Sequence, residues 1–114
     1  MANIIGTRGP DLLAGSNAAD VLVGLAGNDR INGIDGDDRL DGGDGQDELS
    51  GDAGNDYVLG GRDNDMLTGA EGDDLLHGGS GNDQLHGEEG DDRLFGADGR
   101  RVPAVQAQRE AALV

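Results

Sequence analysis

Ten aspartates spaced nine residues apart are the side chains in this sequence best placed to do chemistry. They are Asp11, Asp20, Asp29, Asp38, Asp47, Asp56, Asp65, Asp74, Asp83 and Asp92. Carboxylate oxygens are hard ligands, and Ca²⁺ takes about six to eight oxygens in a geometry that tolerates irregularity. The row of carboxylates therefore predicts repeated binding of a divalent cation, provided that the fold brings the aspartates together.

Each of these aspartates is the sixth residue of a nine-residue block that repeats without insertion or deletion over residues 6–95. Block 1 begins at Gly6 and block 10 at Gly87. The first position is Gly in all ten blocks, the fourth is Gly in eight, and the eighth is aliphatic in all ten. Ala18 and Asp63 replace the fourth-position Gly in blocks 2 and 7. A repeat with so regular a period is typical of a repeat architecture.

The other positions of the block predict the elements that hold the aspartates. Two glycines within four residues allow positive φ or close backbone approach, so positions one to six predict a tight turn. Positions seven to nine then form a very short strand, in which the position-eight side chain points inward and its neighbours mostly face water. Carbonyls of the turns are expected to add oxygens to the cation sites near Gly24, Gly27, Gly33, Gly36, Gly42, Gly45, Gly51, Gly54, Gly69, Gly72, Gly78, Gly81, Gly87 and Gly90.

A three-residue strand cannot stand alone, so the blocks must stack. Two blocks, 18 residues together, complete one circuit of a coil, and successive circuits lie about 4.8 Å apart as parallel strands. The chain is then an all-β parallel β-solenoid whose two thin sheets bury the aliphatic residues between them. Alternate aspartates form a column along each edge, where stacked carboxylates repel one another unless a cation lies between them.

The composition limits what else the chain could be. It has 24 acidic and 8 basic residues among 114, a net charge of −16, which opposes binding to nucleic acid and anionic membranes and favours cations. With 23 Gly and no Cys or Trp, a conventional core is hard to build, and composition alone favours disorder. No apolar stretch reaches the length of a membrane span, and the first ten residues do not resemble a secretory signal peptide.

The blocks resemble the G-G-x-G-x-D-x-U-x repeat of RTX (haemolysin-type calcium-binding) proteins over residues 6–95. The resemblance implies a right-handed parallel β-roll of ten nonapeptide repeats, with Ca²⁺ between blocks n and n+2. Sites would pair Asp11 with Asp29, Asp29 with Asp47, and so on along each edge, for up to eight ions in four gaps per edge. The departures at Ala18 and Asp63 put the sites that touch blocks 2 and 7 in question.

The resemblance also implies a biological setting. RTX proteins are exported by type I secretion machinery and fold outside the cell, so we expect a secreted, extracellular protein. In their parent proteins, which include cytolysins, metalloproteases and lipases, the repeats are an accessory module. The chain is therefore expected to bind Ca²⁺ and fold on binding, and not to be an enzyme. Two alternatives stay open: an accessory fragment of a larger type I-secreted hydrolase or toxin, or a calcium-dependent surface or matrix adhesion protein that self-associates.

The two ends depart from the repeat. Residues 1–5 are a lead-in, and Thr7 and Pro10 make block 1 atypical, as expected for the blunt end of a rod. Residues 96–114 begin a degenerate block that fails at Arg101 and Pro103, and residues 105–114 favour a short helix. This tail is interpreted equally as a cap, as a secretion signal, or as the result of truncation of a longer protein.

Other metal and catalytic chemistries fit the sequence poorly. No EF-hand loop and no HExxH motif occur. His77 and His86 stand at position nine of adjacent blocks and are therefore expected on opposite sheets, too far apart for a shared zinc site. A carboxylate that ligates Ca²⁺ stays ionised and is a poor general acid.

Overall fold

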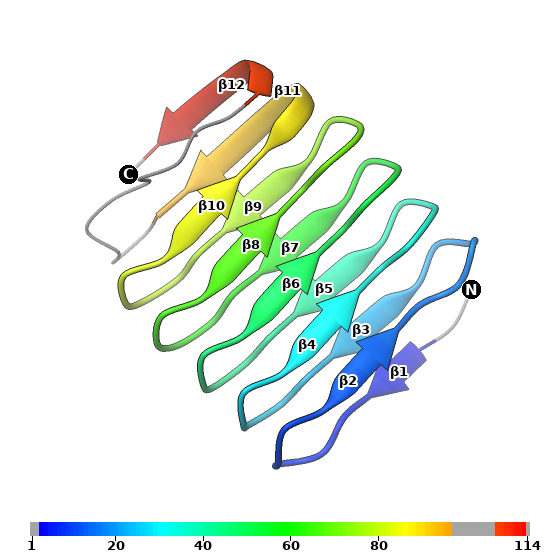
Figure 1. Ribbon diagram of the computed structural model, residues 1–114, viewed down its shortest axis with the longest axis vertical. Coiled ribbons are helices and arrows are strands. Elements are labelled where there is room, and N and C mark those ends of the chain that lie inside the picture. Colours follow the sequence, from blue (N-terminus) through cyan, green and yellow to red (C-terminus); the bar gives the residue numbers. More distant parts are fainter. Residues whose placement is uncertain (1–2, 97–106, 114) are drawn as a thin grey trace.

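The computed structural model describes residues 3–96 in full and the backbone of residues 107–113. Two parallel sheets face each other as the walls of a flat coil (Figure 1). The seven-stranded sheet contains β1 (Asn3–Ile5), β3 (Val21–Val23), β5 (Arg39–Asp41), β7 (Tyr57–Leu59), β9 (Leu75–His77), β11 (Glu88–Phe95) and β12 (Ala107–Leu113). The five-stranded sheet contains β2 (Leu12–Ala14), β4 (Arg30–Asn32), β6 (Glu48–Ser50), β8 (Met66–Thr68) and β10 (Gln84–His86).

The register confirms a circuit of 18 residues. Each strand pairs in parallel with the strand of the next circuit, as where Leu40 of β5 lies beside Val58 of β7. The strands occupy positions seven to nine of blocks 1 to 9, and the turns occupy the rest; in block 10, β11 begins already at position two. The prediction of a parallel β-solenoid is therefore confirmed.

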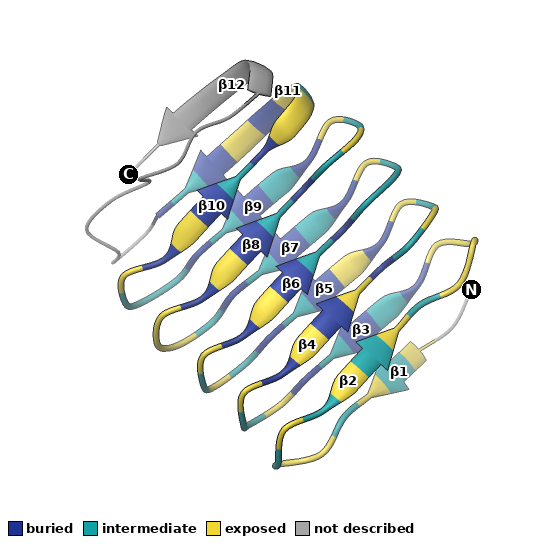
Figure 2. Cartoon of the chain, in the orientation of Figure 1, coloured by how far each residue is buried: buried dark blue, intermediate teal, exposed yellow. Residues whose placement is uncertain are grey.

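The core is one row of aliphatic side chains from position eight. These residues are 0–2% exposed in blocks 2 to 10: Leu22, Ile31, Leu40, Leu49, Val58, Leu67, Leu76, Leu85 and Leu94. Leu13 of block 1 and Ile4 pack against the end of the row and are only partly buried. Figure 2 shows this buried stripe at the centre of the strands. Full burial of one such side chain contributes about 1.5–3 kcal/mol, so the row is the main apolar contribution to stability.

The outer faces of the two sheets differ, which the repeat pattern did not predict. On the five-stranded sheet, position seven is exposed, as at Arg30, Glu48 and Gln84. On the seven-stranded sheet, positions seven and nine of β3, β7 and β9 carry half-buried and largely apolar side chains, whereas Arg39 and Arg93 are exposed and Asp41 is half-buried. We call the half-buried set the outer apolar face: Val21, Val23, Tyr57, Leu59, Leu75, His77 and Phe95. The expectation that these positions mostly face water therefore fits only one sheet.

Both ends extend the repeat further than predicted. The lead-in contains β1, whose Ile4 stands nine residues before Leu13 and pairs with Leu22. The predicted helix over residues 105–114 is wrong, because Ala107–Leu113 forms β12 in parallel with β11. An isolated helix of this length is marginal, whereas the edge of β11 offers unpaired backbone groups that a strand satisfies.

Among the described residues, no helix has the length and apolar composition needed to cross a lipid bilayer. Residues 1–2, 97–106 and 114 lie outside the described part, and the expectations for Arg101 and Pro103 fall there.

Candidate metal centre

The position-six aspartates stack in two columns, as predicted. The backbone N–H of Asp11 donates to Oδ1 of Asp29 across 2.8 Å, and this contact repeats from each circuit to the next. Along the same edge it links Asp29, Asp47, Asp65 and Asp83. Along the other edge it links Asp20, Asp38, Asp56, Asp74 and Asp92. One carboxylate oxygen of each acceptor aspartate is thus used to hold successive turns together.

The second carboxylate oxygen points into a buried space that holds no hydrogen-bond donor for it. Asp38 and Asp47 are each 3% exposed, and the other position-six aspartates of blocks 3 to 9 are 1–3% exposed. Within residues 3–96, Oδ2 has no hydrogen-bond partner in the following aspartates: Asp29, Asp38, Asp47, Asp56, Asp65, Asp74 and Asp83. Because a buried ionised oxygen without a partner is very costly, each of these atoms calls for either a proton or a cation.

The first-position glycine is required by this oxygen. A Cβ on Gly42 would lie 2.5 Å from Oδ2 of Asp47 and 2.8 Å from the carbonyl oxygen of Gly60. A Cβ on Gly60 would meet Oδ2 of Asp65 and the carbonyl oxygen of Gly78 at 2.7 Å each. Beside Gly42 and Gly60, the Oδ2 atom of an aspartate and a carbonyl oxygen of the next circuit therefore lie close together, which suits a hard cation.

The turns owe their shape to left-handed residues at two positions. From block 3 onward, positions two and four both have positive φ, as at Leu25 (72°) and Gly27 (94°). Glycine adopts this conformation freely, but Ile34 at φ 75° pays a steric cost of about 1–2 kcal/mol. Asp63 keeps φ at 73° in place of Gly, so block 7 retains the turn that its sequence had put in question.

The sequence model of the RTX calcium-binding nonapeptide repeat, in four copies, matches residues 3–31, 32–67 and 68–102. The chain belongs to this RTX repeat family. The resemblance to RTX proteins that was inferred from the nine-residue repeat is thereby confirmed. The family match supports calcium binding by a repeat protein. No curated protein matches the sequence.

The ligands of an RTX site in this chain cannot be carboxylates alone. Within residues 3–96, no group of three or more His, Cys, Asp or Glu side chains converges to hold a metal ion. Pairs of aspartates are nevertheless stacked, and carbonyl oxygens such as that of Gly60 lie beside them. Because Ca²⁺ accepts main-chain carbonyls and water as well as carboxylates, this donor set fits Ca²⁺.

Burial perturbs the acidity of the columns. Desolvation is the largest cause, opposed by the backbone hydrogen bond to Oδ1, and the stacked carboxylates of neighbouring turns raise the pKa further in most of them. The pKa of Asp65 and of Asp74 is raised to about 8 near the middle of the roll. It is raised to about 7 in Asp47 and Asp56. It is raised to about 6 in Asp38 and Asp83, and it is also raised in Asp29. Protons therefore compete with cations for these sites near neutral pH.

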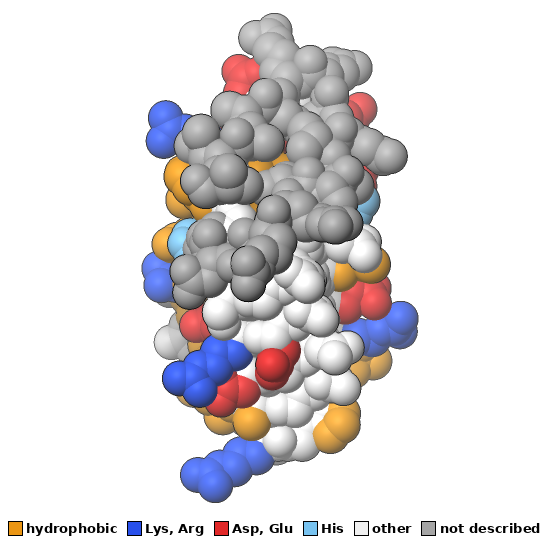
Figure 3. Space-filling model, turned by 90° about the vertical axis from the view of Figure 1, so that its left-hand side faces the viewer, with side chains coloured by type: hydrophobic (Ala, Val, Ile, Leu, Met, Phe, Trp, Pro, Cys, Tyr) orange, Lys and Arg blue, Asp and Glu red, His pale blue; other side chains and the backbone are white. Residues whose placement is uncertain are grey.

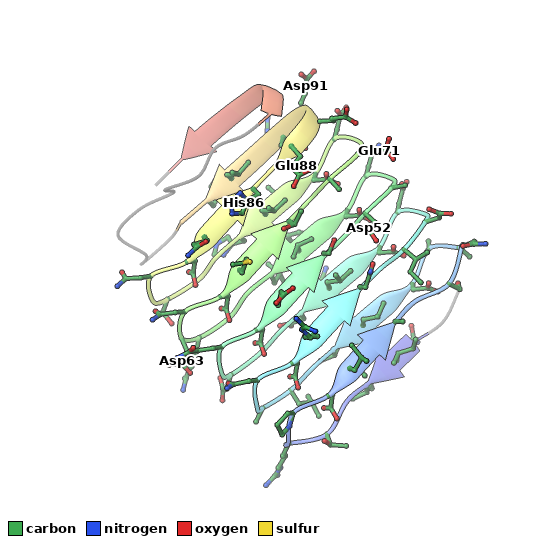
Figure 4. All side chains as sticks on the ribbon, viewed as in Figure 1. Asp52, Asp63, Glu71, His86, Glu88 and Asp91 are labelled. Atoms are coloured by element: carbon green, nitrogen blue, oxygen red, sulfur yellow. The ribbon has the colours of Figure 1, made fainter. Side chains whose placement is uncertain are left out.

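Solvent reaches one column through a groove of about 480 Å³ along the edge that precedes the five-stranded sheet. Asp29, Asp47 and Asp65 form part of its lining, between position-five amides such as Asn28 and Asn64. Figure 3 looks onto this edge, where few acidic side chains reach the described surface. In Figure 4, the labelled turn acids Asp52, Glu71, Glu88 and Asp91 lie along the opposite edge, while Asp63 lies on this one.

Position five has a role that the sequence reading did not assign. Its side-chain oxygen accepts the backbone N–H of the residue 18 positions on, as from Gln46 to Asn28 and from Asn55 to Asp37, both 2.8 Å. These side chains form a second ladder on the outside of the turns. The preference for Asn or Asp at this position was the available signal.

The two histidines do not form a site. His77 lies on β9 and His86 on β10, in different sheets, as expected from their spacing. His77 stacks on Phe95 with ring centroids 6.2 Å apart, so its place in the structure is explained by packing.

Proposed function

We propose that the position-six aspartates from block 3 onward bind Ca²⁺ between successive circuits, and that this binding supplies the free energy that folds the chain. The observation that carries the proposal is the set of buried Oδ2 atoms without hydrogen-bond partners, each beside glycine backbone. A folded roll without cations must bury these charges or protonate them, and both are unfavourable at neutral pH. Because a cation binds the folded arrangement and not the extended chain, its binding free energy becomes folding free energy.

A calcium titration followed by far-UV circular dichroism tests this proposal. We expect a coil-rich chain in chelator and a cooperative gain of β-structure with Ca²⁺. Mg²⁺ is the control, because it demands near-octahedral geometry and gives up its water reluctantly. A chain that is fully β-structured in chelator, or one that stays coil at millimolar Ca²⁺, would contradict the proposal.

The same coupling suits a secreted protein. RTX repeat proteins are generally secreted, and extracellular calcium modules typically bind at about 10⁻⁴–10⁻³ M, far above cytosolic calcium. The chain would remain extended before export by a type I system and fold outside the cell, with no enzymatic role of its own. Co-expression with a type I exporter, with the chain assayed in medium and cell fractions, tests this; retention in the cells despite an active exporter would contradict it.

Calcium-dependent self-association is a second candidate, favoured by the outer apolar face of the seven-stranded sheet. Tyr57, Leu59, Leu75 and Phe95 lie there in neighbouring strands. At −16 the chains repel one another, and bound Ca²⁺ would reduce that repulsion. Sedimentation velocity with and without Ca²⁺ separates the candidates: a calcium-dependent dimer lost in Leu59→Ser supports self-association, and a monomer at all calcium concentrations excludes it.

A further inference from the structure

The first two turns of the roll are closed by hydrogen bonds that the later turns lack. The backbone N–H of Thr7 donates to Oδ2 of Asp11 at 2.6 Å, and its hydroxyl donates to Oδ1 at 2.9 Å. Ser16 makes similar contacts to Asp20: its N–H donates to Oδ2 at 2.6 Å, and its hydroxyl lies 2.9 Å from Oδ2 and 3.2 Å from Oδ1. Both carboxylates thus have the donors that the Oδ2 atoms of the following aspartates lack: Asp29, Asp38, Asp47, Asp56, Asp65, Asp74 and Asp83.

The hydroxyls also close the turns themselves. The N–H of Gly9 donates to the Thr7 hydroxyl and that of Ala18 donates to the Ser16 hydroxyl, both at 3.2 Å. Each turn is therefore bridged from its fourth position through the hydroxyl to the carboxylate. The local sequence agrees with this, because Thr7 and Ser16 are the only hydroxyl residues at position two of the ten blocks.

The backbone conformation changes at the same boundary. Left-handed residues begin at Leu25, and none of the described residues before it has a positive φ. Ala18 occupies the fourth position of block 2, and its Cβ makes a left-handed conformation unfavourable there. The turn with two left-handed residues is thus confined to blocks 3 to 10, and block 2 differs from them in both sequence and conformation.

We propose that Thr7 and Ser16 exclude calcium from the first two turns and make them a metal-independent N-terminal cap. This inference rests on the proposed binding of Ca²⁺ by the later turns. On one edge, the first gap between circuits lies beside Oδ2 of Asp11 and the Gly24 carbonyl. On the other edge, it lies beside Oδ2 of Asp20 and the Gly33 carbonyl. An N–H dipole aimed at Oδ2 repels a cation and already satisfies the oxygen. Each edge therefore holds one ion fewer than its four gaps between aspartates would allow.

The cap has a use in folding. A solenoid needs an end that is stable without a further neighbour, and blocks 1 and 2 meet this need with side chains instead of ions. The partly buried Ile4 and Leu13 and the fully buried Leu22 provide its apolar contacts. Calcium-dependent turns can then add to this end.

The number of ions bound per chain at saturating Ca²⁺, measured by equilibrium dialysis, tests the cap. Three proteins are compared: the wild type, the double variant Asp11→Asn with Asp20→Asn, and the matched double variant Asp47→Asn with Asp56→Asn. We expect the first double variant to bind as many ions as the wild type and the second to bind fewer. Circular dichroism in Ca²⁺ verifies that each variant folds.

A gain-of-site variant and the converse outcomes complete the test. Thr7→Gly with Ser16→Gly restores the residue found at Gly43, Gly61 and Gly79, and we expect additional ions in the first turns. Equal losses of ions in the two Asp→Asn double variants would overturn the cap while leaving calcium binding intact. A wild type that binds no Ca²⁺ would instead overturn the proposed function, and the cap with it.

Discussion

The backbone N–H of Asp47 donates to Oδ1 of Asp65, 2.8 Å away and one circuit further along the roll. The other oxygen of Asp65 has no hydrogen-bond partner although the residue is 3% exposed. One side chain therefore does two separate things: Oδ1 fixes the stacking of the turns, and Oδ2 is left for a cation. Asparagine keeps an oxygen in place of Oδ1 and removes the negative charge at Oδ2, so Asp→Asn changes distinguish the two roles.

Asp65→Asn should weaken the calcium response without preventing folding. The amide oxygen can still accept the N–H of Asp47, while the ligand for Ca²⁺ is lost. We expect the midpoint of the calcium titration to rise about tenfold, equivalent to about 1.4 kcal/mol. In chelator, the same variant should be more folded than the wild type, because it neither buries a charge at this position nor has to take up a proton there on folding.

The control for this variant is Asp35→Asn, which removes one negative charge from an exposed turn position. If both variants shift the midpoint equally, overall charge and not ligation controls the response. Circular dichroism and calorimetric titration on the two variants give the comparison.

The sequence predicted those features that repeat. An invariant aliphatic residue at position eight, such as Leu49 or Leu67, is enough to indicate a buried row, and a beat of nine sets a circuit of 18 residues. The stacking of Asp47 on Asp65 follows from the same arithmetic. These predictions succeeded because each rests on many equivalent positions.

The features that the sequence did not predict are those that differ between blocks. The roles of Thr7 and Ser16 depend on a hydroxyl meeting one particular carboxylate, and position two varies too much for its pattern to show this. The tail was interpreted as helical from its alanines, because sequence propensity cannot include the open edge of β11. The outer apolar face was not predicted, because its residues occur only in alternate blocks and positions seven and nine are mixed when all ten blocks are taken together.

The stability of the calcium-free roll should fall as the pH rises. The pKa of Asp65 is raised to about 8 and that of Asp47 to about 7, against an ordinary value of 3.8. A pKa raised by folding contributes stability that is complete below the ordinary value and is lost as the pH rises through the folded value. In chelator, β-structure should therefore decrease between about pH 5 and pH 9. Circular dichroism across this range measures it, and a loss on acidification from pH 7 to pH 5 would contradict the raised pKa values.

Calcium binding should show the opposite dependence on pH. In calcium-free chains that are folded, the pKa of Asp65 and Asp74 is raised to about 8, and these side chains must lose their protons when Ca²⁺ binds; in unfolded chains they are already ionised. Affinity should therefore rise from about pH 6 to about pH 8 and level off above that. Titration calorimetry in two buffers of different ionisation enthalpy counts the protons released, and release of none at pH 7 would show that the sites are already ionised.

Truncation of the core should cost most in the middle of the roll. Leu49 is 1% exposed and lies within the row, so Leu49→Ala should lower the free energy of unfolding of the calcium-bound form by about 2–5 kcal/mol. Leu13 packs at the end of the same row and is only partly buried, so Leu13→Ala should cost less. Urea denaturation at saturating Ca²⁺ measures both, and equal costs would mean that the terminal turn is packed as tightly as the centre.

Two glycines from different turns should respond oppositely to a methyl group. A Cβ on Gly42 would lie 2.5 Å from Oδ2 of Asp47 and 2.8 Å from the Gly60 carbonyl, inside the space that we assign to the cation. Gly42→Ala should therefore destabilise the calcium-bound roll by about 1–3 kcal/mol and raise the calcium midpoint. A Cβ on Gly9 would meet nothing closer than the Thr7 hydroxyl at 3.9 Å. Because φ is not positive there, Gly9→Ala should be neutral or stabilise by about 0.4–1 kcal/mol.

The pair of glycine variants separates crowding of the site from a general effect on chain flexibility. Both substitutions restrict the unfolded chain in the same way, so any difference between them arises in the folded state. Calcium titrations and urea denaturation at saturating Ca²⁺ on the two variants provide the comparison. Equal behaviour would mean that the first-position glycine can move away from the Asp47 carboxylate, and that the oxygen-lined space beside Gly42 is not where the cation binds.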